Sequence, residues 1–179
     1  LMNYNNVLQA IDMITGDQGL SMSPKRITLS TSGVPKMMKK LADDGVKFHL
    51  ALSLHSAIQE KRQVIMPFAE RFILDDVLEA LIYWYEKTKR RVTFEYIVWD
   101  GFNDTDRDIA ALVKFCKKVP CKVNIIEYNA IDDGEFKQAA PHRVAAYTQA
   151  LEQARIPVTV RRSRGDDIDA ACGQLANKH

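Results

Sequence analysis

The segment Lys47–His55, with the sequence KFHLALSLH, decides the fold. Every second residue between Phe48 and Leu54 is a large apolar side chain, which is the period of a β-strand with one apolar face. We therefore predict a strand over Lys47–Leu54 in a sheet that is covered by helices. The strand ends in Ser53-Leu54-His55, so polar groups stand at its carboxyl end.

Four further β-rich runs alternate with amphipathic segments. They are Arg26–Thr31, Arg91–Val98, Lys122–Tyr128 and Val158–Arg162. The amphipathic segments predict helices at Asn5–Thr15, Pro35–Asp44, Leu74–Thr88, Asp106–Lys118 and His142–Ala154. Strands that alternate with helices form mostly parallel sheets with right-handed crossovers. The sequence therefore predicts an α/β fold.

Residues that favour helix starts support these boundaries. Pro35 suits a first helical turn, Asp75 and Asp76 suit the positive end of a helix, and Thr105 suits a capping position. Trp84 lies on the apolar face of its predicted helix, so we interpret it as a core residue and not as a platform for stacking bases.

The composition is that of one globular domain and does not by itself indicate a class of function. The chain has 179 residues, of which 46% are hydrophobic, and a net charge of +2, so RNA contacts would need a local basic patch. Its three cysteines form no disulfide framework, which favours a reducing, cytoplasmic location. No apolar run is long enough to span a membrane.

An apolar pattern is already established by Val7, so we expect the chain to begin inside a larger protein.

Distinctive polar groups follow four of the predicted strands. They are Ser30 to Gly33, Ser53 to His55, Glu95-Tyr96 and Asn124 to Asn129. Ligands bind at the carboxyl ends of parallel strands, so these groups are expected to meet at one edge. Taken singly, each has an ordinary alternative, since a serine there is usually a turn residue and a histidine is usually structural.

The C-terminal segment combines basic residues with a lone thiol. Arg161, Arg162 and Arg164 are candidates for phosphate contacts, although a solvated strand end explains them equally well. Cys172 has only small neighbours, which suits covalent chemistry, whereas a buried free cysteine is the ordinary alternative. Cys116 and Cys121 are interpreted as structural.

Taken together, these motifs resemble the radical S-adenosylmethionine (SAM) enzymes of the RlmN family, which methylate C2 of adenine in 23S ribosomal RNA and transfer RNA. The resemblance covers essentially the whole chain and is strongest at Thr28–Val34, Ser53–His55, Lys122–Asn129 and Arg164–Ala176. It implies a partial TIM-like (β/α) barrel of the radical SAM type whose N-terminal strands are missing. Residues 1–179 would be the C-terminal part of one (β/α)6-type domain, with no second domain.

The resemblance also implies roles for individual residues. Ser30, the Ser53-Leu54-His55 run and Asn129 match family positions that contact SAM. Cys172 matches the cysteine that is methylated and then joined covalently to the RNA base. The implied partners are 23S rRNA, tRNA and an electron donor for a [4Fe–4S] cluster.

Parts of the family pattern are absent from this sequence. The Cys-x₃-Cys-x₂-Cys cluster ligands and the Gly-Glu-Pro element are not found, so we predict no metal site in the chain and no activity of the chain alone. Glu127 and Ala130 stand where the family pattern has prolines. With preceding strands missing, the Arg26–Thr31 strand is expected to leave an exposed sheet edge through which the chain self-associates.

Three alternatives remain open at this point. One is the related resistance-type enzyme that methylates adenine at C8, which uses the same cysteine chemistry. Another is a non-catalytic RNA-binding module that uses the basic strand end. The third is an unrelated α/β-barrel enzyme that acts on a small metabolite.

Overall fold

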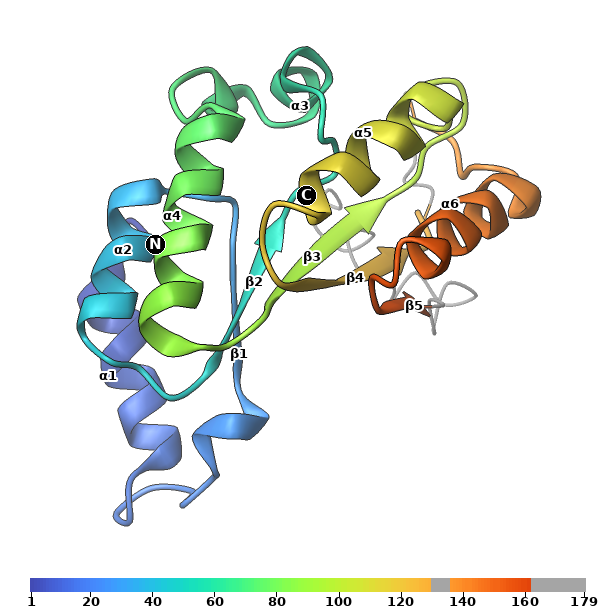
Figure 1. Cartoon of the computed structure of the whole chain (residues 1–179). Coiled ribbons are helices and arrows are strands. Elements are labelled where there is room, and N and C mark those ends of the chain that lie inside the picture. Colours follow the sequence, from blue (N-terminus) through green and yellow to red (C-terminus); the bar gives the residue numbers. More distant parts are fainter. Residues whose placement is uncertain (130–135, 162–179) are drawn as a thin grey trace, which may run out of the picture.

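The computed structural model describes residues 1–129 and 136–161 and contains one five-stranded parallel sheet in the order β1-β2-β3-β4-β5. The strands are β1 (Thr28–Thr31), β2 (His49–Ser53), β3 (Val92–Ile97), β4 (Cys121–Ile126) and β5 (Val158–Arg161). The predicted α/β class with a parallel sheet is therefore confirmed (Figure 1). Each observed strand lies within its predicted run or within one residue of it.

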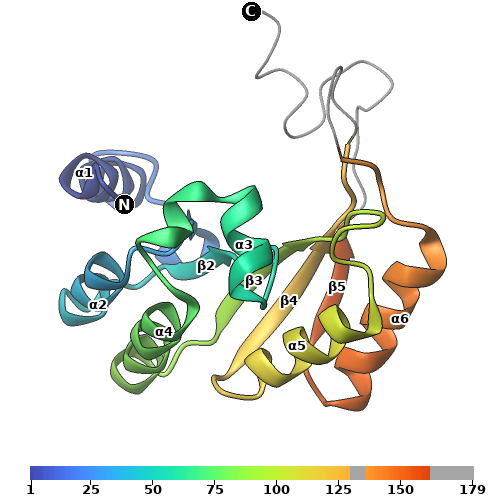
Figure 2. The same ribbon diagram turned by 90° about the horizontal axis from the view of Figure 1, so that it is seen from above.

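Helices cover one face of this sheet. The described helices are α1 (Tyr4–Thr15), α2 (Pro35–Asp43), α3 (Gln59–Ile65), α4 (Leu74–Thr88), α5 (Asp106–Cys116) and α6 (Pro141–Gln153), with short 3₁₀ turns η1 (Pro24–Arg26) and η2 (Pro67–Glu70). Figure 2 shows α2, α4, α5 and α6 along the same side of the strands. Each crossover helix connects neighbouring parallel strands, as expected for this fold class.

The two faces of the sheet have opposite chemistry. Paired residues of neighbouring strands point to the same face, and successive residues of one strand point to opposite faces. The face toward the helices is apolar and buried, with Leu52, Phe94 and Val123 all 0% exposed. The other face carries Ser53, which is in register with Glu95. The sheet therefore presents a polar surface on the side without those helices.

Capping residues fix the helix boundaries as the sequence predicted. Thr105 and Asp108 form a capping box at the start of α5, in which each side chain accepts from the backbone of the other. Pro35 lies in the first turn of α2, where its missing N–H costs no hydrogen bond. Trp84 is 0% exposed on α4, so its interpretation as a core residue is confirmed.

Helix α3 was missed by the sequence analysis because its signals are not local. It has only seven residues, and its one fully buried side chain is a charged arginine, Arg62. Its position is set by Gln59, whose side chain donates to the carbonyl of Ala69 in η2 and accepts from the backbone of Leu74 in α4. The helix is therefore held by contacts with residues that follow it at ten and fifteen positions.

Cys116 and Cys121 are buried, which agrees with their interpretation as structural residues. Both are free and lie at the junction of α5 and β4. A hydrogen bond with Cys121 and burial both raise the pKa of the Cys116 thiol, so this thiol does not readily form a thiolate.

Within residues 1–129 and 136–161, none of the helices is long and apolar enough to cross a membrane.

The exposed edge of β1 predicts self-association. In the described structure β1 pairs only with β2, which leaves one side of Thr28–Thr31 unpaired. We expect sedimentation velocity to show a sedimentation coefficient that rises with protein concentration. Thr28→Lys should weaken this, because a charged edge residue opposes strand pairing, whereas Gln18→Lys on another exposed segment should not. A monomer at every concentration contradicts the prediction.

Candidate functional site

A cavity of about 540 Å³ lies on the polar face of the sheet, at the carboxyl ends of the strands. Its volume falls within the range of small-molecule sites in proteins. Its lining combines polar and apolar side chains and comprises Thr28, Ser30, Ala51, Ser53, His55, Glu95, Ile97, Ile126, Glu127, Tyr128, Asn129 and Arg161. All five strands therefore contribute to one hollow.

Five residues to which the sequence analysis assigned a SAM or phosphate contact line this cavity. They are Ser30, Ser53, His55, Asn129 and Arg161. Leu54 does not line it, because its side chain is 0% exposed among the core residues. Its backbone N–H is used too, since it donates to the carbonyl of Glu95 at 3.0 Å. Cys172, Arg162 and Arg164 lie outside the described residues, so their predicted roles stay predictions.

His55 is held in one orientation and one tautomer. Its backbone adopts a left-handed conformation with φ of 54°, and its Nδ1 accepts a hydrogen bond from the backbone N–H of Ile97 at 3.2 Å. A neutral imidazole that accepts at Nδ1 carries its proton on Nε2. Burial, with a smaller contribution from the charge of Arg62, lowers the pKa of His55 from 6.5 to about 4. His55 is therefore a neutral hydrogen-bond donor through Nε2 near pH 7.

The conformation of the turn after β1 depends on Gly33, and a hydrogen bond from Arg62 stabilises it. Gly33 has φ of +98°, and a Cβ atom there would lie 2.9 Å from the side chain of Leu52. The guanidinium of Arg62, itself 0% exposed, donates to the carbonyl of Ser32 at 2.6 Å. The turn formed by Ser30 to Gly33 is therefore fixed, and its last position requires glycine.

One buried amide joins the ends of β2 and β3. Asn103 is 0% exposed, and its Nδ2 donates to the carbonyls of His55 at 2.7 Å and Ile97 at 2.9 Å. Its Oδ1 accepts from the backbone N–H of Trp99 at 2.7 Å. These bonds satisfy backbone groups that the sheet no longer pairs. The sequence analysis did not identify Asn103, which comes from a loop and follows no strand directly.

A hydrogen-bonded row of side chains crosses the polar face. Thr159 donates to Oδ1 of Asn124 at 2.5 Å, and Nδ2 of Asn124 donates to Oε1 of Glu95 at 3.0 Å. The parallel register places these three residues side by side on β5, β4 and β3. The other carboxylate oxygen of Glu95, Oε2, is buried without a hydrogen-bond partner among the described residues.

Aromatic rings pack beside His55 at the same end of the sheet. Trp99 lies 5.8 Å from the ring of His55, 6.0 Å from that of Tyr128 and 5.1 Å from that of Phe136. Trp99 is only 6% exposed, so it supports the wall of the cavity and is not available to stack on a ligand. Tyr128 belongs to the lining itself.

Glu127 shows what one departure from the family pattern does. Its backbone N–H donates to the carbonyl of Arg161 at 3.2 Å, which extends the pairing of β4 with β5 by one bond. A proline has no N–H and could not make this bond. The rim next to Tyr128 is therefore tied to β5 in this chain.

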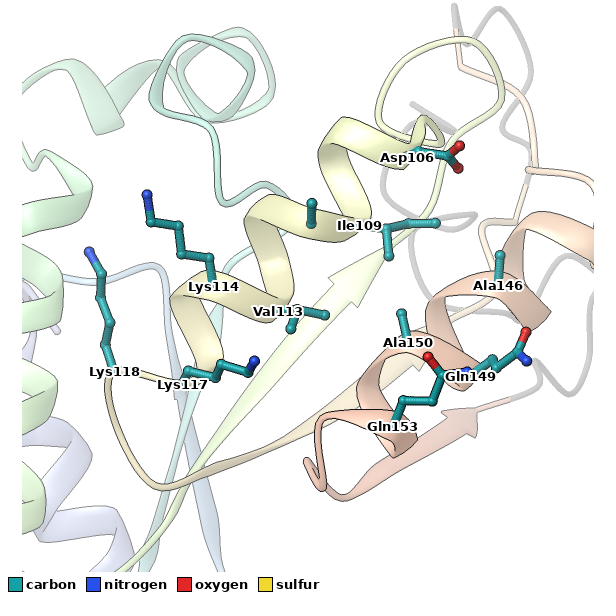
Figure 3. A pocket seen from close by; sticks show the side chains of 11 residues that line it. Asp106, Ile109, Val113, Lys114, Lys117, Lys118, Ala146, Gln149, Ala150 and Gln153 are labelled. Atoms are coloured by element: carbon teal, nitrogen blue, oxygen red, sulfur yellow. The ribbon is translucent and has the colours of Figure 1, made fainter.

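A larger groove of about 720 Å³ lies between α5 and α6, away from the strand ends (Figure 3). Its lining is mostly apolar, with Ile109 and Val113 facing Ala146 and Ala150, and Lys114, Lys117 and Lys118 lie toward one end (Figure 3). None of the residues that the sequence analysis singled out lies there. Size alone would therefore select a hollow that none of these residues lines.

Comparison with known proteins finds relatives that match almost the whole chain. A probable dual-specificity RNA methyltransferase RlmN from Flavobacterium johnsoniae is 67% identical over 178 residues, which are 99% of this chain and 51% of that protein. The chain is homologous to the RlmN methyltransferases. A protein of the same description from Christiangramia forsetii is 66% identical over the same share of the chain. The chain spans about half the length of these curated relatives, and no protein-family model matches it.

Solved structures agree with the RlmN homology. A radical SAM methyltransferase from Sphaerobacter thermophilus superposes with a TM-score of 0.92 and 34% identity, over 97% of this chain and 51% of its own. A domain of a pyruvate-formate lyase-activating enzyme from Bacteroides vulgatus shares the fold alone, with a TM-score of 0.64 and 13% identity. The resemblance predicted from the motifs, and the match to part of a radical SAM fold, are confirmed.

Loss of the Asn103 side chain should destabilise the fold. Asn103→Ala leaves the backbone groups of His55, Ile97 and Trp99 without partners, which should lower the free energy of unfolding by about 3 kcal/mol. Urea denaturation measures this change. Asn6→Ala at an exposed position of α1 is the control and should have almost no effect. Equal stability of the two variants would show that the three hydrogen bonds contribute little.

The lowered pKa of His55 predicts a loss of stability in acid. His55 binds a proton near pH 6.5 in the unfolded state and only near pH 4 in the folded state. The contribution of the neutral side chain to stability is therefore fully present above pH 6.5 and is lost as the pH falls from 6.5 to about 4. The slope is at most about 1.4 kcal/mol per pH unit. In urea denaturation at several pH values, His55→Asn should flatten this slope. Asparagine is chosen because it tolerates the positive φ of this position. His142→Asn, at an exposed position, should not flatten it; identical slopes for both variants count against the burial of His55.

Proposed function

We propose that this chain provides the SAM-binding strand ends and the methyl-carrying cysteine of an enzyme that methylates C2 of adenine in 23S rRNA and tRNA. The convergence of Ser30, Ser53, His55 and Asn129 on one cavity carries the proposal. They come from three different segments that the resemblance had matched to SAM contacts. Homology to RlmN supplies the reaction and the RNA substrates that the proposal names.

The chemistry of the lining fits SAM. Ser30, Ser53 and Nε2 of His55 offer hydrogen-bond donors for a carboxylate and for ring nitrogens. Ala51, Ile97 and Ile126 offer apolar surface for the adenine ring. The buried Oε2 of Glu95 is an acceptor that lacks a donor among the described residues. When bound, SAM supplies the methyl group and, with a reduced cluster, the radical chemistry of the reaction.

The described residues do not fit a [4Fe–4S] cluster. No group of three or more cysteine, histidine or acidic side chains comes together within residues 1–129 and 136–161. Cys116 and Cys121 are buried between α5 and β4. The proposal therefore assigns the cluster to residues of the whole enzyme that this chain does not contain, and the chain alone is expected to be inactive.

Cys172 is assigned the covalent role. The C2 carbon of adenine is neither acidic nor nucleophilic, so a direct polar methyl transfer has no reactive partner on the base. A thiolate can instead attack the methyl carbon of a sulfonium, which forms an S–CH₃ bond and breaks the original carbon–sulfur bond. The methylated Cys172 then carries the carbon that is joined to the base.

Arg161 is assigned to RNA. It is the last residue of β5, it is exposed, and it lies on the lining of the cavity. A cation at this position can hold a phosphate so that a neighbouring base reaches the cavity. Arg162 and Arg164 follow it in sequence and extend the same assignment.

The test uses the enzyme at the length of its relatives, reconstituted with iron and sulfide and incubated with SAM, a reductant and ribosomal or transfer RNA. Mass spectrometry of the digested RNA should locate a new methyl group at C2 of adenine. Cys172→Ala should abolish methylation, because no other side chain is assigned to carry the methyl group. Cys121→Ala, which changes a buried structural thiol, should keep at least part of the activity.

Other outcomes select the alternatives. A methyl group at C8 would replace the proposal with the resistance-type reaction. RNA binding that weakens with salt, is unaffected by Cys172→Ala and is accompanied by no methylation would indicate a non-catalytic RNA-binding module. Methylation that persists fully in Cys172→Ala would remove the covalent step.

A further inference from the structure

The groove between α5 and α6 leaves apolar side chains partly exposed. Ile109 and Val113 of α5 face Ala146 and Ala150 of α6 across a hollow of about 720 Å³ (Figure 3). Val113, Ala146 and Ala150 are only half-buried, although each packs against the core on one side. An open apolar groove between two helices is a surface that an amphipathic helix can fill.

One end of this groove is basic. Lys114, Lys117 and Lys118 line it and are exposed, and their spacing of three and four residues places them together at the C-terminal end of α5. Lys117 and Lys118 also line an adjoining hollow of about 390 Å³, together with Arg91 and Arg155. Within the part of the chain that the structure describes, no acidic residue lines that hollow.

These five cations have no counter-charge in the described structure. The ion pairs within residues 1–129 and 136–161 all involve other basic residues. Helix dipoles favour cations near the C-terminal ends of helices, which can account for Lys114 in the last turn of α5. They do not explain why a cluster of unpaired cations continues an open apolar groove. Since like charges that lie together repel one another, an anionic group that binds them is stabilised.

The groove lies away from the cavity at the carboxyl ends of the strands. Helices α5 and α6 cover one face of the sheet (Figure 2), whereas that cavity lies on the opposite, polar face. The five cations lie at or beside the connections that lead into β3, β4 and β5, at the other ends of these strands. A partner in the groove would therefore leave the cavity open.

The lining of the groove favours a protein partner over RNA. Unpaired bases are bound by stacking on aromatic rings or on arginine, and neither kind of side chain lines the groove among the described residues. A phosphate backbone would also leave Val113, Ala146 and Ala150 uncovered. An acidic amphipathic helix matches both parts of the surface, because its apolar side chains cover the groove and its carboxylates reach the lysines.

We propose that the groove between α5 and α6 binds an acidic amphipathic helix of another protein. Helix α5 has 11 residues and is about 16 Å long, so the partner helix needs about three turns. Its leucine or isoleucine side chains, spaced three and four residues apart, pack against Val113, Ala146 and Ala150, and its carboxylates lie at the lysine end. This inference goes beyond the proposed function and does not depend on it.

The test selects partner segments from natural sequences. Peptides that tile the proteome of the source organism are displayed and selected on the enzyme at the length of its relatives. The binders should be acidic, should carry apolar residues at helical spacing and should bind more weakly as the salt concentration rises. Synthetic copies of the binders then give dissociation constants by fluorescence anisotropy, for the wild type and three variants.

The variants separate the charge of the surface from its shape. Lys117→Glu reverses one charge at the basic end and should raise the dissociation constants roughly tenfold or more. Ala150→Leu fills the groove and should weaken binding without a change of charge. Lys36→Glu, at an exposed position of α2, is the matched control and should leave the affinities unchanged. Thermal unfolding checks that the three variants fold as the wild type does.

Three results would overturn the proposal. In the first, the selected peptides are unaffected by Lys117→Glu and by Ala150→Leu, so they bind elsewhere. In the second, no peptide is selected on the enzyme, which would show that the groove is covered or unused in the whole protein. In the third, Lys117→Glu lowers the affinity for RNA and leaves peptide binding unchanged, which would assign the basic end to RNA.

Discussion

The parallel register of the strands is the constraint on which the site depends. A shift of one residue in a strand would turn every side chain to the opposite face. The burial of Leu52, Phe94 and Val123 under the helices therefore also fixes where Ser53, Glu95 and Asn124 point. The polar row is not placed by its own interactions alone. It follows from the apolar contacts on the other side of the sheet.

Much of the fold follows from local sequence. The two-residue period of Lys47–His55, repeated in four other runs, predicts the strands, and residues such as Pro35 and Thr105 predict where helices begin. The site is partly predictable for the same reason. Polar residues at the carboxyl ends of parallel strands must meet at one edge, so Ser30 and Asn129 come together although they lie far apart in the sequence.

The remaining features depend on contacts between distant residues, and no local pattern encodes them. The hydrogen bonds of Asn103 to His55 and of Arg62 to Ser32 span 48 and 30 positions. Glu95 was noted only as a polar residue near a strand end, because its pairing with Asn124 requires the register of β3 with β4. The tautomer of His55, which follows β2, likewise depends on the backbone of Ile97 at the end of β3.

The contact of Arg62 with the turn after β1 couples two parts of the molecule. Its guanidinium lies over the ring of Phe68 in η2 at 5.8 Å and also binds the carbonyl of Ser32. Helix α3 and this turn are consequently joined through one side chain, and a displacement of either would disturb these contacts. Substitutions around η2, remote in sequence from the cavity, would be transmitted to it through a single cation. Adaptation of this site to new ligands is therefore easier by exchanging side chains than by moving the loop.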